Sequence, residues 1–105
     1  MKTPEPPYYA VIFTARRSAD GEGYEETAHR MFDLAAKQPG FLGYDTADGE
    51  LGITVSFWAD EAAIAAWKRD ADHAYAQDEG RTRWYDAYEI RVARVERAYG
   101  FVRPS

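Results

Sequence analysis

The stretch from Phe41 to Trp58, FLGYDTADGELGITVSFW, decides the fold. In its middle stands Asp48-Gly49, a pair that strongly favours the tight turn between two antiparallel strands. Strands are expected over 41–46 and 51–58. On the second strand, Ile53, Val55 and Phe57 share one face, and Trp58 lies on the other with two hydroxyl residues. The centre of the chain is therefore predicted to be a β-hairpin.

A helix is expected on each side of this hairpin. Before it, apolar residues recur at helical spacing over 24–37, and Gln38-Pro39-Gly40 ends that pattern. After it, Asp60 is suited to cap a helix that carries Ile64 and Trp67, and a further helical segment is expected to about Glu79.

Two further strands are expected outside the helices. The run Tyr8–Ala15, YYAVIFTA, is apolar on both sides, which is typical of a strand covered on both faces. The last strand is expected over 85–99. Its apolar residues switch from one face of the strand to the other, and this switch predicts a bulge near Ala93-Arg94. The order β-α-β-β-α-β predicts an α+β, ferredoxin-like antiparallel sheet. Residues 1–7 are expected to form a flexible N-terminal arm, and residues 8–105 a single domain.

The composition of the chain excludes several classes of function. A chain of 105 residues holds one domain, and its net charge of −5 argues against nucleic acid or an anionic membrane as a main partner. The absence of cysteine excludes disulfides, thiolate metal sites and thiol nucleophiles. No long apolar run or signal-peptide layout is present, so the expected location is cytoplasmic. No phosphate loop, dinucleotide fingerprint or nucleophilic triad is visible, so no cofactor is expected.

Several segments resemble the antibiotic biosynthesis monooxygenase (ABM) domain family. They are Pro39-Gly40-Phe41-Leu42-Gly43, Ser56-Phe57-Trp58, the helix Glu61–Trp67, His73, and the tail segments Gly80-Arg81 to Trp84-Tyr85 and Arg91–Arg97. The resemblance covers about Tyr8 to Phe101. It implies a ferredoxin-like fold whose sheets pair into a homodimeric α+β barrel, with a pocket between sheet and helices in each subunit.

The family includes cofactor-free quinol monooxygenases, haem degraders and members of unknown activity. Its cofactor-free members oxidise polyphenolic or quinol substrates with O₂, because such substrates supply the electrons through a stabilised carbanion or radical. The protein then needs an aromatic slot, a proton acceptor and a donor for the developing oxyanion. The resemblance implies a slot formed by Trp67, Phe57 and Trp84, with His73 handling the proton.

Two residues of the second helix have alternative interpretations. Trp67 matches the tryptophan that lines the pocket in active relatives, but a core anchor packed on Ile64 would have the same spacing. His73, with an ordinary pKa of about 6.5, suits a general base, or it is a surface histidine beside Asp72. Six residues turn a helix by about 600°, so Trp67 and His73 can line one pocket only if the helix breaks near 69–72.

The last third of the chain holds the other candidates. Trp84, Tyr85 and Tyr88 are predicted to form a far wall of the pocket, or else a core or dimer interface. Arg81 and Arg83 suit an anionic or phenolate substrate, or a solvated helix end. The last strand also carries five charges that suit cross-subunit ion pairs or protection of a sheet edge: Glu89, Arg91, Arg94, Glu96 and Arg97.

Two other functions remain open, and a third is disfavoured. A non-catalytic dimer that binds an apolar small molecule or serves a stress or regulatory role fits the sparse catalytic residues. Haem binding through His73 is weakened because the chain has no asparagine and Gln77 stands where haem-degrading relatives have histidine. A metal site on the stripe Glu25, His29 and Asp33 is disfavoured against a solvated helix face, so no metal is expected.

Overall fold

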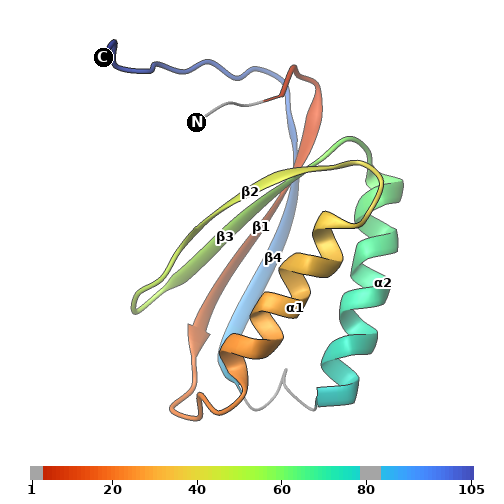
Figure 1. Cartoon of the computed structure of the whole chain (residues 1–105), viewed down its shortest axis with the longest axis vertical. Coiled ribbons are helices and arrows are strands. Elements are labelled where there is room, and N and C mark those ends of the chain that lie inside the picture. Colours follow the sequence, from red (N-terminus) through yellow and green to blue (C-terminus); the bar gives the residue numbers. More distant parts are fainter. Residues whose placement is uncertain (1–3, 79–83) are drawn as a thin grey trace.

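The computed structural model describes residues 4–78 and 84–105, with side chains over 4–72 and 84–105. The elements follow one another as β1 (Tyr8–Arg17), α1 (Tyr24–Ala36), β2 (Phe41–Ala47), β3 (Gly52–Trp58), α2 (Glu61–Asp78) and β4 (Tyr85–Val95). The strands form one antiparallel sheet in the order β2-β3-β1-β4. Both helices lie on the same face of this sheet (Figure 1). The ferredoxin-like α+β fold predicted from the element order is confirmed.

The registers assign each strand residue to a face. Residues paired across neighbouring strands point to the same side, and successive residues alternate. Tyr9 is paired with Trp58 and with Arg94, and both Tyr9 and Trp58 belong to the core beneath the helices. We call this side the helix-facing side. The opposite side, called the far face, includes Phe57, which is paired with Ala10.

Gly40 closes the connection from α1 to β2. Its φ is +90°, a conformation that glycine adopts without strain. Its carbonyl accepts a hydrogen bond of 2.7 Å from the Ala59 N–H, which joins the start of β2 to the end of β3. A Cβ at this position would stand 2.9 Å from the Ala63 Cβ, so the backbone here approaches α2 as closely as packing allows.

The start of α2 confirms the predicted cap. The Asp60 Oδ1 accepts a 2.8 Å hydrogen bond from the Ala63 N–H, which satisfies one donor of the first helical turn. From Glu61 the helix continues without interruption to Asp78. The break near 69–72 that would let Trp67 and His73 line one pocket is therefore not present.

Two expectations for the last strand are wrong. The pairing of β4 with β1 is continuous from Tyr88 to Val95, and the irregularity lies at the other end, between Arg16 and Arg17. This edge strand carries apolar residues on both faces, and in the sequence they resemble a switch of the apolar residues from one face to the other. The strand also ends at Val95, not at Tyr99, which is 94% exposed in an extended segment. Figure 1 shows this segment leading away from the sheet to the C-terminus.

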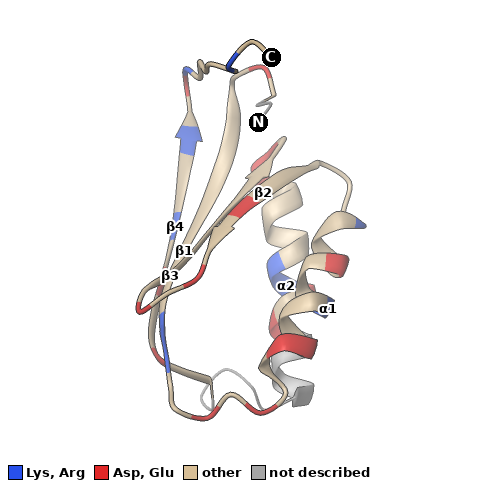
Figure 2. Ribbon diagram, turned by 60° about the vertical axis from the view of Figure 1, so that its left-hand side comes forward, with Lys and Arg blue, Asp and Glu red and all other residues tan. Residues whose placement is uncertain are grey.

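The core lies between the helices and the middle of the sheet. One cluster consists of Val11, Ala35, Trp58 and Ala63, and a second of Met31 and Ala71, with Trp67 packed against both. Over the described ranges, no helix is long and apolar enough to cross a membrane. In Figure 2 charges of both signs lie along α1 and along β4.

Candidate functional site

Two tryptophans meet where α2 crosses β3. The rings of Trp58 and Trp67 are 5.5 Å apart at an angle of 39°. Trp58 is fully buried, and Phe41 packs edge-on against it at 5.2 Å. The Trp58 indole N–H donates a 2.8 Å hydrogen bond to the Ser56 Oγ, its neighbour on the same face of β3. The first indole is therefore fully engaged in the core.

The second indole differs from the first in the surroundings of its N–H group. The Trp67 Nε1 is buried, and no acceptor for its N–H is present among the residues whose side chains are described. A buried donor without a partner costs about 1–3 kcal/mol relative to a satisfied one. Such a group in a native structure calls for an explanation, and a ligand that brings its own acceptor is one.

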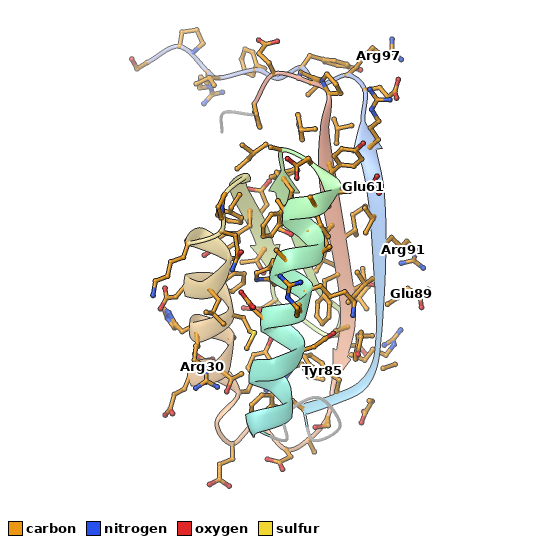
Figure 3. The ribbon with its side chains drawn as sticks, turned by 90° about the vertical axis from the view of Figure 1, so that its right-hand side faces the viewer. Arg30, Glu61, Tyr85, Glu89, Arg91 and Arg97 are labelled. Atoms are coloured by element: carbon orange, nitrogen blue, oxygen red, sulfur yellow. The ribbon has the colours of Figure 1, made fainter. Side chains whose placement is uncertain are left out.

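Beyond β1 the helix-facing side of the sheet is open. Three residues of β4 lie there, because they pair with Ala15, Phe13 and Val11 in turn: Tyr88, Ile90 and Val92. They are 37%, 46% and 51% exposed. The helices pack mainly against β2 and β3, and Figure 3 shows β4 at the margin of the sheet, to one side of α2. We call Tyr88, Ile90 and Val92 the open strip.

Aromatic rings connect the open strip with the interior. Phe13 on β1 stacks with Tyr88 at 5.5 Å and 28°, and meets Tyr85 edge-on at 5.6 Å. Tyr85 and Tyr88 are themselves 5.7 Å apart. Tyr88 thus offers a flat aromatic surface beside apolar side chains, and its role as a wall of the site stays a prediction.

Trp84 directly precedes β4 and holds the entry of this strand in place. It is 2% exposed, and its indole N–H donates to the Glu22 carbonyl at 2.8 Å. Its own carbonyl accepts the Ser18 N–H at 2.8 Å, and Tyr24 packs edge-on against its ring at 5.9 Å. These contacts join the entry of β4 to the loop before α1. Substrate binding by Trp84 stays a prediction.

The slot expected from Trp67, Phe57 and Trp84 is not assembled as one surface. Phe57 belongs to the far face, where it meets the ring of Tyr8 edge-on at 5.8 Å. The sheet therefore separates Phe57 from Trp67. The aromatic neighbours that the fold brings to Trp67 are Trp58 and, behind it, Phe41. The signal for Trp58 was present in the sequence as an aromatic residue sharing a strand face with Ser56.

Two predicted site residues cannot be placed in this geometry. His73 belongs to α2, but its side chain lies outside the described part of the chain, as does the whole of Arg83. In a continuous helix, positions 67 and 73 are about 120° apart around the axis. Their roles stay predictions.

No metal centre is present among the described residues. They contain no group of three or more histidine, cysteine, aspartate or glutamate side chains that could hold an ion. Glu25, His29 and Asp33 are all exposed along α1.

The chain matches the family described as Antibiotic biosynthesis monooxygenase over residues 7–79. It is 54% identical over 99 residues to the uncharacterized protein YqjZ of Bacillus subtilis, a match that covers 91% of this chain and 86% of YqjZ. It is also 37% identical over 43 residues to Jasmonate monooxygenase ABM of Pyricularia oryzae, covering 41% of this chain and only 20% of that protein.

Solved structures share the fold at low sequence identity. SnoaB, a cofactor-independent oxygenase from Streptomyces nogalater, has a TM-score of 0.67 and 12% identity, covering 89% of this chain and 97% of SnoaB. PA3566 from Pseudomonas aeruginosa has a TM-score of 0.64 and 17% identity, covering 90% of this chain and 97% of that chain.

Proposed function

We propose that this chain, which belongs to the antibiotic biosynthesis monooxygenase family, is a cofactor-independent monooxygenase that oxidises a small aromatic or quinol compound with O₂. The observation that carries the proposal is the buried indole N–H of Trp67, which has no acceptor among the described side chains. A substrate oxygen that becomes negatively charged during the reaction would be a suitable acceptor.

The reaction needs no added reductant. A substrate methylene next to a phenolic ring can be oxidised as R₂CH₂ + O₂ → R₂CO + H₂O, because the substrate supplies all four electrons. Removal of a proton places negative charge on the phenolic oxygen, and a donor in a dry environment stabilises that charge more strongly than water does. We assign that donor to Trp67, the aromatic wall to Tyr88 and the proton acceptor to His73.

Binding of a substrate must be accompanied by a rearrangement that opens a path to Trp67. Since its Nε1 is shielded from water, a substrate reaches this atom only when neighbouring side chains shift. The open strip provides an exposed apolar surface from which such a substrate could enter. Binding that involves this rearrangement expels water from the reacting groups, which also protects a reactive carbanion or radical.

Oxygen uptake with a panel of hydroquinones and phenolic methylene compounds tests the proposal. We expect uptake by the wild type and a large loss in the His73→Ala/Trp67→Phe double variant. His29→Ala is the matched control, because the other histidine is exposed on α1. Equal rates for the wild type and the double variant across the panel would reject the proposed activity.

We also propose that the protein is a homodimer. The far face supports this assembly, because Ile12, Val55 and Phe57 are only half-buried there and Ile53 is 38% exposed. An apolar sheet face of this kind is suited to contact with another protein surface. Sedimentation at micromolar concentration tests the assembly. The cytoplasmic location stays a prediction from the sequence.

Non-catalytic binding of an apolar small molecule is the second candidate function. It is favoured by the composition of the open strip, whose three side chains offer apolar contacts and a single phenol but no carboxylate or imidazole. Saturable quenching of tryptophan fluorescence by an aromatic ligand, with no oxygen uptake from any compound of the panel, would support this candidate over the monooxygenase.

A further inference from the structure

The helix-facing side of β4 changes in character along the strand. From position 88 to position 94, the residues that β1 pairing assigns to this side are Tyr88, Ile90, Val92 and Arg94. The first three form the open strip, and the fourth carries a guanidinium group. Successive residues on one face of a strand are about 7 Å apart, so Arg94 stands one such step beyond Val92. The apolar surface of the open strip therefore ends in a positive charge.

Of the two arginines of β4, only Arg94 is placed to serve the candidate site. Arg91 is paired with Ile12 on the far face, and Figure 3 shows its side chain pointing away from α2. Arg94 is paired with Tyr9, whose ring packs against the core cluster beneath the helices. The sheet thus lies between the two guanidinium groups, and one of them shares a side with the open strip.

The open strip runs past the strand positions that support Trp67. This indole packs against the cluster that contains Val11, and Val11 is paired with Val92 in the middle of the strip. The next row of residues crosses the sheet from Trp58 to Arg94. Two strand spacings separate the ends of this row, about 10 Å. A ligand held at Arg94 and lying along the strip would therefore pass beside the two tryptophans.

In the free chain, Arg94 already holds a carboxylate. Its Nη1 lies 3.6 Å from the Oε1 of Glu96, and the two side chains are 55% and 73% exposed. Such an ion pair contributes little stability, because water and salt screen both charges. Glu96 follows the end of β4 and offers no apolar surface to the strip. A ligand carboxylate can replace it at low cost and gain apolar contacts in addition.

We propose that the substrates of this chain are amphipathic carboxylates. The carboxylate binds Arg94 in place of Glu96, and an aromatic or apolar body lies along Val92, Ile90 and Tyr88. The inference rests on the proposed function and names the substrate class of the same site. It also fixes the direction of the substrate, because the charged end is held at Arg94 and the ring is left beside Trp67.

The charges of the molecule favour a ligand with one carboxylate. The planar guanidinium group matches the two oxygens of a carboxylate, and a single arginine neutralises a single negative charge. The chain has a net charge of −5, which disfavours ligands with several negative charges. From Arg94 to Ile90 the strand spans about 13 Å, so the body that fits is a ring with a chain of several carbons.

Calorimetric titration of the full-length chain without O₂ tests the proposal. The probe is 6-(4-hydroxyphenyl)hexanoate, which joins a carboxylate to a phenolic methylene, and the matched neutral compound is its primary amide. We expect the carboxylate to bind with a Kd about fivefold lower than that of the amide, because the pair with Arg94 is partly exposed. This preference should shrink at high salt, since screening weakens the pair.

Two pairs of variants locate the charge that is responsible. Arg94→Gln should remove the preference by raising the Kd of the carboxylate to that of the amide. Arg91→Gln, which removes the same charge from the far face, should keep the preference. Glu96→Gln frees Arg94, so we expect it to lower the Kd of the carboxylate about threefold. Glu89→Gln on the far face is its control, and circular dichroism checks the folding of all four variants.

The outcomes separate this inference from the proposed function. Equal Kd values for the carboxylate and the amide in the wild type, or a preference that survives Arg94→Gln, would overturn the assignment to carboxylates. Oxidation of neutral hydroquinones would then still support the monooxygenase. Conversely, a preference that depends on Arg94 without oxygen uptake from any compound would overturn the monooxygenase activity and leave the carboxylate site in place.

Discussion

The rings of Trp58 and Trp67 lie 5.5 Å apart at an angle of 39°, yet of the two only Trp58 has an acceptor for its indole N–H among the described side chains. The first donates to Ser56 on the same strand, whereas α2 holds the Nε1 of the second in a buried position without an acceptor among the described side chains. Two tryptophan side chains of one cluster thus have different roles. One indole stabilises the core, and the other retains hydrogen-bonding capacity.

This difference predicts unequal effects on stability. Trp58→Phe removes a hydrogen bond and leaves a space in a fully buried site, so we expect it to lower the free energy of unfolding by about 2–4 kcal/mol. Trp67→Phe removes a donor that has no acceptor among the side chains described, so its cost should be clearly smaller. Urea unfolding of both variants checks the order, and equal losses would contradict it.

Gly40 should tolerate no side chain. Gly40→Ala introduces a Cβ that would stand 2.9 Å from the Ala63 Cβ, at a φ of +90°. We expect a loss of about 1–3 kcal/mol in the free energy of unfolding. Gly100→Ala is the control, because no atom lies within 4 Å of its added Cβ. Thermal unfolding measures both, and similar melting temperatures would show that α2 can move aside.

The cap of α2 depends on one carboxylate. Asp60→Ala removes the acceptor for the Ala63 N–H and should lower the free energy of unfolding by about 1 kcal/mol. Asp60→Ser keeps an oxygen that can accept this bond, so we expect it to retain most of the stability. Chemical denaturation distinguishes the two variants. An equal loss in both would indicate that the charge of Asp60, not the hydrogen bond, stabilises the helix.

The open strip should contribute to ligand affinity. Tyr88→Ser removes a ring that stacks with Phe13 and is 37% exposed. Loss of about 1 kcal/mol of aromatic contact corresponds to a Kd roughly fivefold higher for a small aromatic ligand. Quenching of tryptophan fluorescence measures this affinity. Tyr99→Ser, in the extended C-terminal segment, is the control and should leave the Kd unchanged.

The order of elements and several local details could be predicted because they depend on neighbouring residues. Asp48-Gly49 indicated the hairpin, and Asp60 indicated the start of the second helix, which the Ala63 hydrogen bond confirms. Helical and strand periodicities are properties of short segments, so they can be recognised without knowing what the segments pack against. The bulge expected at Ala93-Arg94 was wrong because an edge strand can carry apolar residues on both faces without a change of phase.

The sequence by itself determined the ferredoxin-like order of strands and helices, and it divided each strand into two faces by alternation. Only the tertiary structure decided which face the helices cover. That choice buried Trp58 against Trp67, placed Phe57 on the opposite side of the sheet and left Tyr88, Ile90 and Val92 open. Alternation repeats every two residues and is the same for either face, so it contains no information about which side packs against helices. That assignment depends on contacts between residues far apart in the chain.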